Sequence, residues 1–167
     1  MTIRAGDPGI DEERCVALWL AALQHRDGFA PPADSRDRAH AKFRGEIVRF
    51  GIAETPRAST TANDVTAIAT DSIDGFALTV RDSADTALLE LIAVTPRASG
   101  AGTGRALLDD AVAFAAASGY RNLDLWVRRG NERAAALYVS RHFEATGGVE
   151  PHPLGGEPML HFRRALA

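Results

Sequence analysis

The feature that most restricts the fold is a run in which a buried strand meets a helix through a glycine-rich loop. Residues 87–94 are nearly continuous apolar sequence with one carboxylate, which indicates a central strand buried on both faces. Apolar residues from Ala106 to Ala117 recur on one side of a helix, and Gly119 can form its C-terminal cap. Between them lie three alternating glycines, Gly100, Gly102 and Gly104. A strand, loop and helix in this order predict an α/β fold.

Length and composition favour one domain. A chain of 167 residues can bury a core of its own but is short for two large domains, so we expect a single domain over residues 1–167. Hydrophobic residues make up 46% and charged residues 25%, close to the average soluble protein, which argues against disorder, collagen and coiled coil.

Charge and residue usage limit the partners. The net charge of −3 provides no general attraction to nucleic acid or anionic lipid. No apolar run approaches the roughly 18 residues of a spanning helix, and the first residues lack the apolar stretch of a signal peptide, so we expect a cytoplasmic protein without membrane contact. Cys15 is the only cysteine and the histidines lack metal-ligand spacing, so neither an intrachain disulfide nor a metal site is expected.

The rest of the chain divides into short helices and strands by its hydrophobic period and turn residues. A stretch rich in Thr, Ala, Pro and Asn over residues 54–64 is expected to be an exposed loop that can move over a substrate. The expected strands are 3–5, 65–70, 73–80, 87–94, 123–127, 143–147 and 159–164, and the expected helices are 11–24, about 35–50 (with Phe43, Ile47 and Phe50), 106–117 and 131–141.

The glycine loop suits phosphate binding. Glycine leaves backbone N–H groups uncovered, and the following helix adds its own free N–H groups and the positive end of its dipole. On its own, this loop is compatible with a diphosphate site, a plain strand-to-helix turn or a dinucleotide-binding loop.

The downstream sequence distinguishes these alternatives, because the chain resembles the GNAT superfamily of N-acetyltransferases over roughly residues 75–147. The resemblance rests on the strand end Ile92-Ala93-Val94-Thr95-Pro96, the loop 100–104 with Leu107-Leu108 behind it, and Asn131 to Tyr138 followed by His142-Phe143. It implies a mixed, mostly antiparallel sheet with helices on both faces and an acetyl-CoA cleft where the central strands splay apart.

The resemblance also implies the cofactor-binding residues. The exposed backbone at the strand end would bind the pantetheine arm, the loop would bind the diphosphate, and the backbone N–H of Val94 would polarise the thioester carbonyl. The implied cofactor-binding residues are Ile92, Ala93, Val94, Ser99, Gly100, Ala101, Gly102, Thr103, Gly104, Arg105 and Asn131.

Two positions depart from the family pattern. Ser99 stands where the family usually has Arg or Gln; the missing charge would come from Arg97 or Arg105, unless both arginines only solvate the surface and the cofactor binds more weakly. His142 stands where the family normally has glycine after the helix, a position that often takes positive φ. We interpret His142 as a tolerated cap rather than a catalyst.

The resemblance gives Tyr138 the role of proton donor to the leaving thiolate, with packing as the alternative. Glu90 is the expected general base, because strand alternation would put it on the same side as Ile92 and Val94. A carboxylate in an apolar strand is costly unless it is hydrogen-bonded or used, so a structural partner such as an arginine is the alternative.

Other polar and aromatic residues have weaker assignments. Trp126 is expected in the core or as a wall of the substrate pocket, and Arg128-Arg129 as a solvated pair near a loop or a contact to the CoA phosphate. An acidic set on or near the second helix, namely Asp34, Asp37 and Glu46, is expected to be a solvent face or to bind a cationic amine.

The sequence therefore predicts an N-acetyltransferase that moves the acetyl group of acetyl-CoA directly to a primary amine of a small molecule or peptide, without a covalent enzyme intermediate. The alternatives are a non-catalytic acyl-CoA-binding module and a nucleotide-binding oxidoreductase; the latter lacks the repeated βαβ pattern of a dinucleotide domain. A homodimer is compatible with the resembling family, and the small negative charge slightly favours a cationic acceptor.

Overall fold

The computed structural model describes residues 1–56, 73–153 and 155–167. The expected strand 65–70 lies outside this part of the chain, as does most of the expected loop 54–64. The motion expected of that loop therefore also concerns residues outside the described part.

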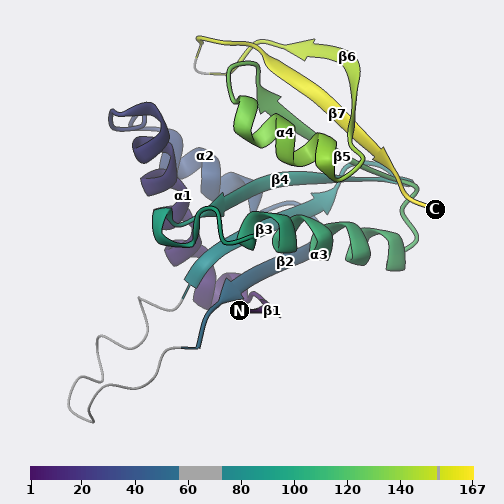
Figure 1. Ribbon diagram of the computed structural model, residues 1–167, viewed down its shortest axis with the longest axis horizontal. Coiled ribbons are helices and arrows are strands. Elements are labelled where there is room, and N and C mark those ends of the chain that lie inside the picture. The colour runs from purple at the N-terminus through teal and green to yellow at the C-terminus, as the bar shows by residue number, and fades with distance from the viewer. Residues whose placement is uncertain (57–72, 154) are drawn as a thin grey trace.

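The described residues form a seven-stranded, mostly antiparallel sheet (Figure 1). Its strands are β1 (Thr2–Ala5), β2 (Ile47–Glu54), β3 (Ile73–Arg81), β4 (Thr86–Val94), β5 (Asn122–Arg128), β6 (Glu144–Glu150) and β7 (Met159–Ala165). Their spatial order is β1-β2-β3-β4-β5-β7-β6, and β4 with β5 is the one parallel pair in it. The predicted fold class is confirmed.

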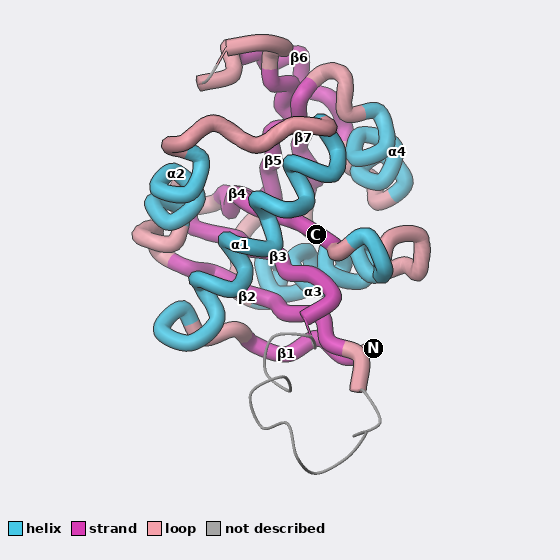
Figure 2. Tube along the Cα trace, turned by 90° about the vertical axis from the view of Figure 1, so that its left-hand side faces the viewer, coloured by secondary structure: helices cyan, strands magenta, loops and turns pink. Residues whose placement is uncertain are grey.

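Helices cover both faces of this sheet, as predicted. They are α1 (Pro8–Asp27), α2 (Ser35–Lys42), α3 (Thr103–Ala117) and α4 (Glu132–Ser140), with a 3-10 turn at Pro96–Ala98. Figure 2 shows α2 on one side of the sheet and α3 with α4 on the other. Two apolar clusters follow from this arrangement, one between the sheet and α1–α2, the other between the sheet and α3–α4. No helix in the described part of the chain is long and apolar enough to cross a bilayer.

The predicted helix over 35–50 is wrong in its second half. The helix ends at Lys42, and β2 begins at Ile47 after a turn. Phe50 and Ile52 alternate toward the α1–α2 cluster as a strand requires, but a register shift between Ile47 and Arg49 lengthens the step to Ile47 to three residues. That β-bulge imitates a helical period, because an extra residue in a strand shifts the alternation by one.

The central strands separate as predicted. Parallel pairing of β4 with β5 runs from Thr86 and Asn122 to Leu89 and Leu125, and it stops there although both strands continue. On the edge that faces β5, the backbone of β4 beyond Leu89 therefore has no strand partner among the described residues. Because unpaired backbone groups are strong donors and acceptors, this edge can bind a ligand.

Candidate active site

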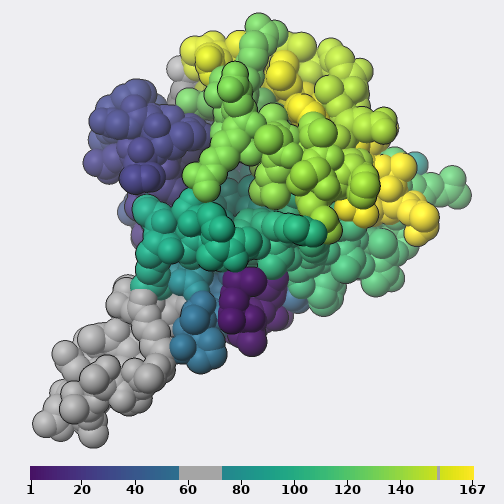
Figure 3. All heavy atoms as spheres, viewed as in Figure 1, coloured from purple at the N-terminus to yellow at the C-terminus, as the bar shows by residue number. Residues whose placement is uncertain are grey.

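Two cavities meet where β4 and β5 separate. The first, which we call the loop cavity, has a volume of about 530 Å³ and lies between the end of β4, the glycine loop and α4. The second, the outer cavity, has about 570 Å³ and is lined by α1, α2, the opening between β4 and β5, and residues of the segments 150–153 and 155–159. Figure 3 shows the hollow between α1, α4 and the glycine loop. The residues common to both cavities are Trp19, Leu23, Arg26, Ile92, Asn131 and Tyr138.

The structure brings most of the predicted cofactor residues together in the loop cavity. Those that line it are Ile92, Ala93, Val94, Ser99, Gly100, Gly102, Gly104, Arg105 and Asn131. Two loop residues are not among its lining: the side chain of Thr103 is buried, and Ala101 is exposed. Tyr138 lines both cavities, whereas Glu90 lines the outer cavity.

The glycine loop has the backbone that a phosphate site needs. Gly100 and Gly102 have φ of +83° and +85°, a conformation that side chains rarely adopt, and a Cβ at either position would meet nothing within 4 Å. Gly102 is the N-cap of α3, so the free N–H groups of its first turn and the positive end of its dipole face this open space. The loop therefore fits an anion such as a diphosphate.

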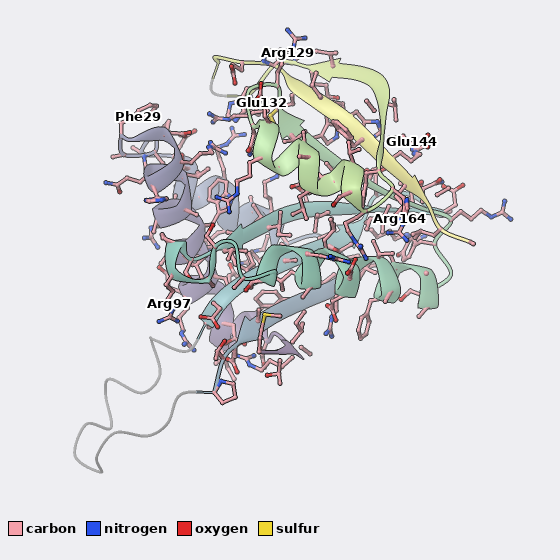
Figure 4. The ribbon with its side chains drawn as sticks, viewed as in Figure 1. Phe29, Arg97, Arg129, Glu132, Glu144 and Arg164 are labelled. Atoms are coloured by element: carbon pink, nitrogen blue, oxygen red, sulfur yellow. The ribbon has the colours of Figure 1, made fainter. Side chains whose placement is uncertain are left out.

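The positive charge near Ser99 comes from a residue that the sequence did not single out. Arg133 of α4 donates from Nη2 to the Ser99 hydroxyl at 2.7 Å, and it lines the loop cavity with Arg105. Arg97 instead binds the buried carboxylate of Asp74 at 3.0 Å, and Figure 4 shows it on the far side of the loop from Phe29. The expectation that Arg97 replaces the missing charge is not supported, because its guanidinium is held at the start of β3.

The N-terminus of α4 follows the sequence prediction. Asn131 is the N-cap, and its side-chain oxygen accepts from the backbone N–H of Ala134 at 3.3 Å. This cap sets the direction of α4, which carries Tyr138 into the apolar cluster beside both cavities.

Tyr138 is 6% exposed, and burial raises the pKa of its phenol to about 12. The hydroxyl is therefore protonated at neutral pH. It has no hydrogen-bond partner within the described part of the chain, so it is available to donate to a bound molecule.

His142 caps the other end of α4. Its φ is +65°, and its N–H donates to the Val139 carbonyl at 3.0 Å. The side chain is exposed and lines neither cavity. The geometry agrees with a strained cap.

Glu90 lines the outer cavity, but its side chain does not lie on the face of β4 that the sequence predicted. The pairing of β3 with β4 shifts between Leu89 and Leu91, so Glu90 is an extra residue and the alternation breaks there. Ile92 packs toward α3, whereas the Glu90 carboxylate accepts from Lys42 Nζ on α2. The prediction that Glu90 shares a face with Ile92 and Val94 is wrong because a β-bulge places two successive side chains on one side.

The outer cavity combines aromatic walls with many cations. Trp19, Trp126 and Phe29 line it, which agrees with the predicted role of Trp126 as a pocket wall. The lining cations are Arg26, Arg38, Lys42 and Arg128, and the lining carboxylates are Asp27, Glu90 and Glu150. None of Asp34, Asp37 and Glu46 is among the described residues that line it, so these residues do not form an acidic amine site there.

Cys15 is remote from this chemistry. It is fully buried in the α1–α2 cluster and lines neither cavity. Burial raises the pKa of its thiol to about 12, so the nucleophilic thiolate is scarce at neutral pH.

Comparison with known proteins identifies the family to which the chain belongs. The profile of the Acetyltransferase (GNAT) family matches residues 30–143, which include the strand end, the glycine loop and α4. The chain belongs to the GNAT acetyltransferase family. A comparison with curated protein sequences gave no match.

Solved structures show the same fold at low sequence identity. The ribosomal-protein-S18-alanine N-acetyltransferase from Escherichia coli has a TM-score of 0.71 at 22% identity, over 99% of this chain and 94% of that one. The IAA acetyltransferase from Bacillus cereus has a TM-score of 0.73 at 15% identity, over 99% of both chains. The Salmonella typhimurium protein yncA, whose structure holds its cofactor acetyl-CoA, has a TM-score of 0.69 at 19% identity, over 100% and 94%.

Proposed function

We propose that this protein transfers the acetyl group of acetyl-CoA directly to a primary amine in a ternary complex. The observation that carries the proposal is the meeting of two cavities at Tyr138, one built for an anionic, extended ligand and one with aromatic walls. Transfer in a single step needs donor and acceptor to touch at one point, and this arrangement provides that point.

Residues of the loop cavity would hold the donor. The α3 N-terminus and the glycines suit the diphosphate, Arg105 and Arg133 add positive charge, and the unpaired edge of β4 up to Val94 suits the amide groups of pantetheine. Acetyl-CoA supplies a thioester, at whose carbonyl carbon the amine nitrogen forms its bond as the carbon–sulfur bond breaks.

Tyr138 would assist the leaving group. Its protonated hydroxyl can donate to the sulfur, which stabilises negative charge that develops there. Because its pKa of about 12 exceeds that of an ordinary thiol, we assign it a hydrogen-bonding role, and the CoA thiolate that leaves takes its proton from solvent.

Glu90 would accept the amine proton, directly or through a water. Its carboxylate lines the cavity proposed for the amine and forms an ion pair with Lys42. No protein nucleophile is required, because buried Cys15 lies outside both cavities.

The first experiment is calorimetric titration of the protein with acetyl-CoA, with NADH as the control, followed by thiol release against a panel of primary amines. Binding of acetyl-CoA and amine-dependent thiol release are expected. Failure to bind acetyl-CoA contradicts the proposal.

A non-catalytic acyl-CoA-binding module is the second candidate, since the Glu90–Lys42 ion pair can be purely structural. Glu90→Gln and Lys42→Met separate the two roles. As the base, Glu90→Gln lowers kcat about a hundredfold and alters the pH profile, whereas Lys42→Met retains most of the rate. An unchanged pH profile in Glu90→Gln, or equal losses in both variants, refutes Glu90 as the base. Acetyl-CoA binding with no thiol release for any amine supports the module.

A further inference from the structure

The outer cavity carries a local charge opposite to that of the whole chain. The protein has a net charge of −3, yet the described residues that line this cavity include four cations and three carboxylates. One of the carboxylates, Glu150, is exposed. The cavity lining thus has an excess of positive charge.

Most of the lining cations already have partners. Lys42 binds Glu90, and Arg26 binds Asp27 through two hydrogen bonds of 2.7 and 2.9 Å. Arg128 contacts Asp27 at 3.8 Å and His152 Nε2 at 3.1 Å.

Arg38 is the exception. It is half-buried on α2 between the buried residues Ser35 and Ala39, and it lines the outer cavity. Within the described part of the chain its guanidinium makes neither a hydrogen bond nor an ion pair. A guanidinium has five N–H donors in a planar fork that matches a carboxylate, so a half-buried one without partners is suited to an anionic ligand.

His152 indicates that the cations act on the same space. The pKa of its imidazole is lowered, first by burial and then by the charges of Arg128, Arg38 and Arg26. A lowered pKa leaves the imidazole neutral near pH 7, so the arginines carry the positive charge here.

The walls define the rest of the ligand. Trp19 and Leu23 line both cavities, and Trp126 lines the outer cavity at the opening between β4 and β5. Exposed Phe29 also lines the outer cavity. An apolar body can therefore pack here while a charged end reaches Arg38.

We propose that the acceptor is a small amino acid-like molecule: a primary amine with an apolar body and a carboxylate that pairs with Arg38. This inference rests on the proposed function, since it names the acceptor of the same reaction. The two ends of the acceptor are opposite in charge, and so are the groups that meet them, Glu90 for the amine and Arg38 for the carboxylate. The overall negative charge of the chain favours a cationic acceptor, but the charge lining the cavity does not.

The experiment compares L-phenylalanine with L-phenylalaninamide, and L-leucine with L-leucinamide. Each pair keeps the amine and the apolar body and differs in the anionic group. We expect kcat/KM to be at least about tenfold higher for the acids. Arg38→Gln should lower the value for the acids roughly tenfold to a hundredfold and leave that for the amides unchanged. Arg38→Lys, which keeps the charge without the fork, should recover part of the loss.

Arg36→Gln is the matched control. Arg36 lies on the same helix, pairs with Glu13 and lines neither cavity, so the same change of charge should leave both substrates unaffected. If it lowers the rate with the acids as much as Arg38→Gln, the effect comes from general charge and the assignment of Arg38 is refuted.

Direct binding keeps the test independent of turnover. Calorimetric titration of the CoA-loaded protein should show tighter binding of the acids than of the amides, and Arg38→Gln should remove the difference. Equal rates and affinities for acids and amides overturn the inference while the proposed acetyltransferase stands. Binding of neither acids nor amides to a protein that binds acetyl-CoA also overturns it, whereas failure to bind acetyl-CoA defeats the proposed function itself.

Discussion

The loop cavity is formed mainly by backbone groups, whereas the outer cavity is formed mainly by side chains. The loop cavity depends on backbone: two glycines at positive φ, a helix N-terminus and the edge of β4 beyond the end of its pairing with β5. The outer cavity depends on side chains from separate segments, with Arg38 and Lys42 from α2, Arg128 from β5 and His152 from beyond β6. A site made of backbone groups can be recognised from a short sequence motif. A site made of side chains forms only when segments far apart in the sequence meet in the fold.

Tyr138 joins the two cavities, so its removal should have the largest effect. Tyr138→Phe is expected to lower kcat about a hundredfold and to leave acetyl-CoA affinity nearly unchanged, because only the hydroxyl is lost. Since the pKa of Tyr138 is raised to about 12, the group stays protonated below that pH, and no alkaline fall in rate below about pH 11 should arise from it. Initial rates across pH check both statements. Tyr120→Phe, a change at a residue that lines neither cavity, is the control; equal loss in both variants contradicts the assignment.

Gly104 tests whether the loop cavity is a backbone site. A Cβ there would meet only Val94 and Leu137, at the ordinary contact distances of 3.5 and 3.6 Å, so Gly104→Ala should fold. In the first turn of α3, alanine should stabilise the protein by about 0.5–1 kcal/mol. It also covers backbone that a phosphate would approach, so acetyl-CoA affinity should fall about tenfold. Thermal melting and calorimetry should thus change in opposite directions; a fall in both indicates a packing role instead.

His142 has a positive φ, which glycine adopts more easily than other residues, and it lies outside both cavities. Its replacement should have the smallest effect. His142→Gly is expected to raise the free energy of unfolding by about 1 kcal/mol, because glycine adopts a φ of +65° without the strain of a side chain. A shift of this size raises Tm by about 2–4 °C. Activity should not change. A loss of activity with gained stability would return His142 to the candidate catalysts.

Sequence patterns predicted the glycine loop and the Asn131 cap, because each depends on neighbouring residues, whereas the resemblance to the GNAT superfamily implied the sheet class and the positive φ at His142. They failed where a β-bulge altered the period: the shift near Ile47 imitated a helix, and the shift at Glu90 broke the alternation on which its predicted face relied. Gly45, a turn signal between α2 and β2, could have corrected the first error.

The sequence by itself determined the backbone of the loop cavity, because the strand end, the glycine loop and the helix N-terminus follow one another directly between Val94 and Thr103. Only the tertiary structure decided which charges meet in the cavities. It bound Arg97 to Asp74, brought Arg133 to Ser99 and left Arg38 in the outer cavity without a partner among the described residues. The physical reason is that charges from distant segments pair by proximity in space, which depends on how the helices and strands pack.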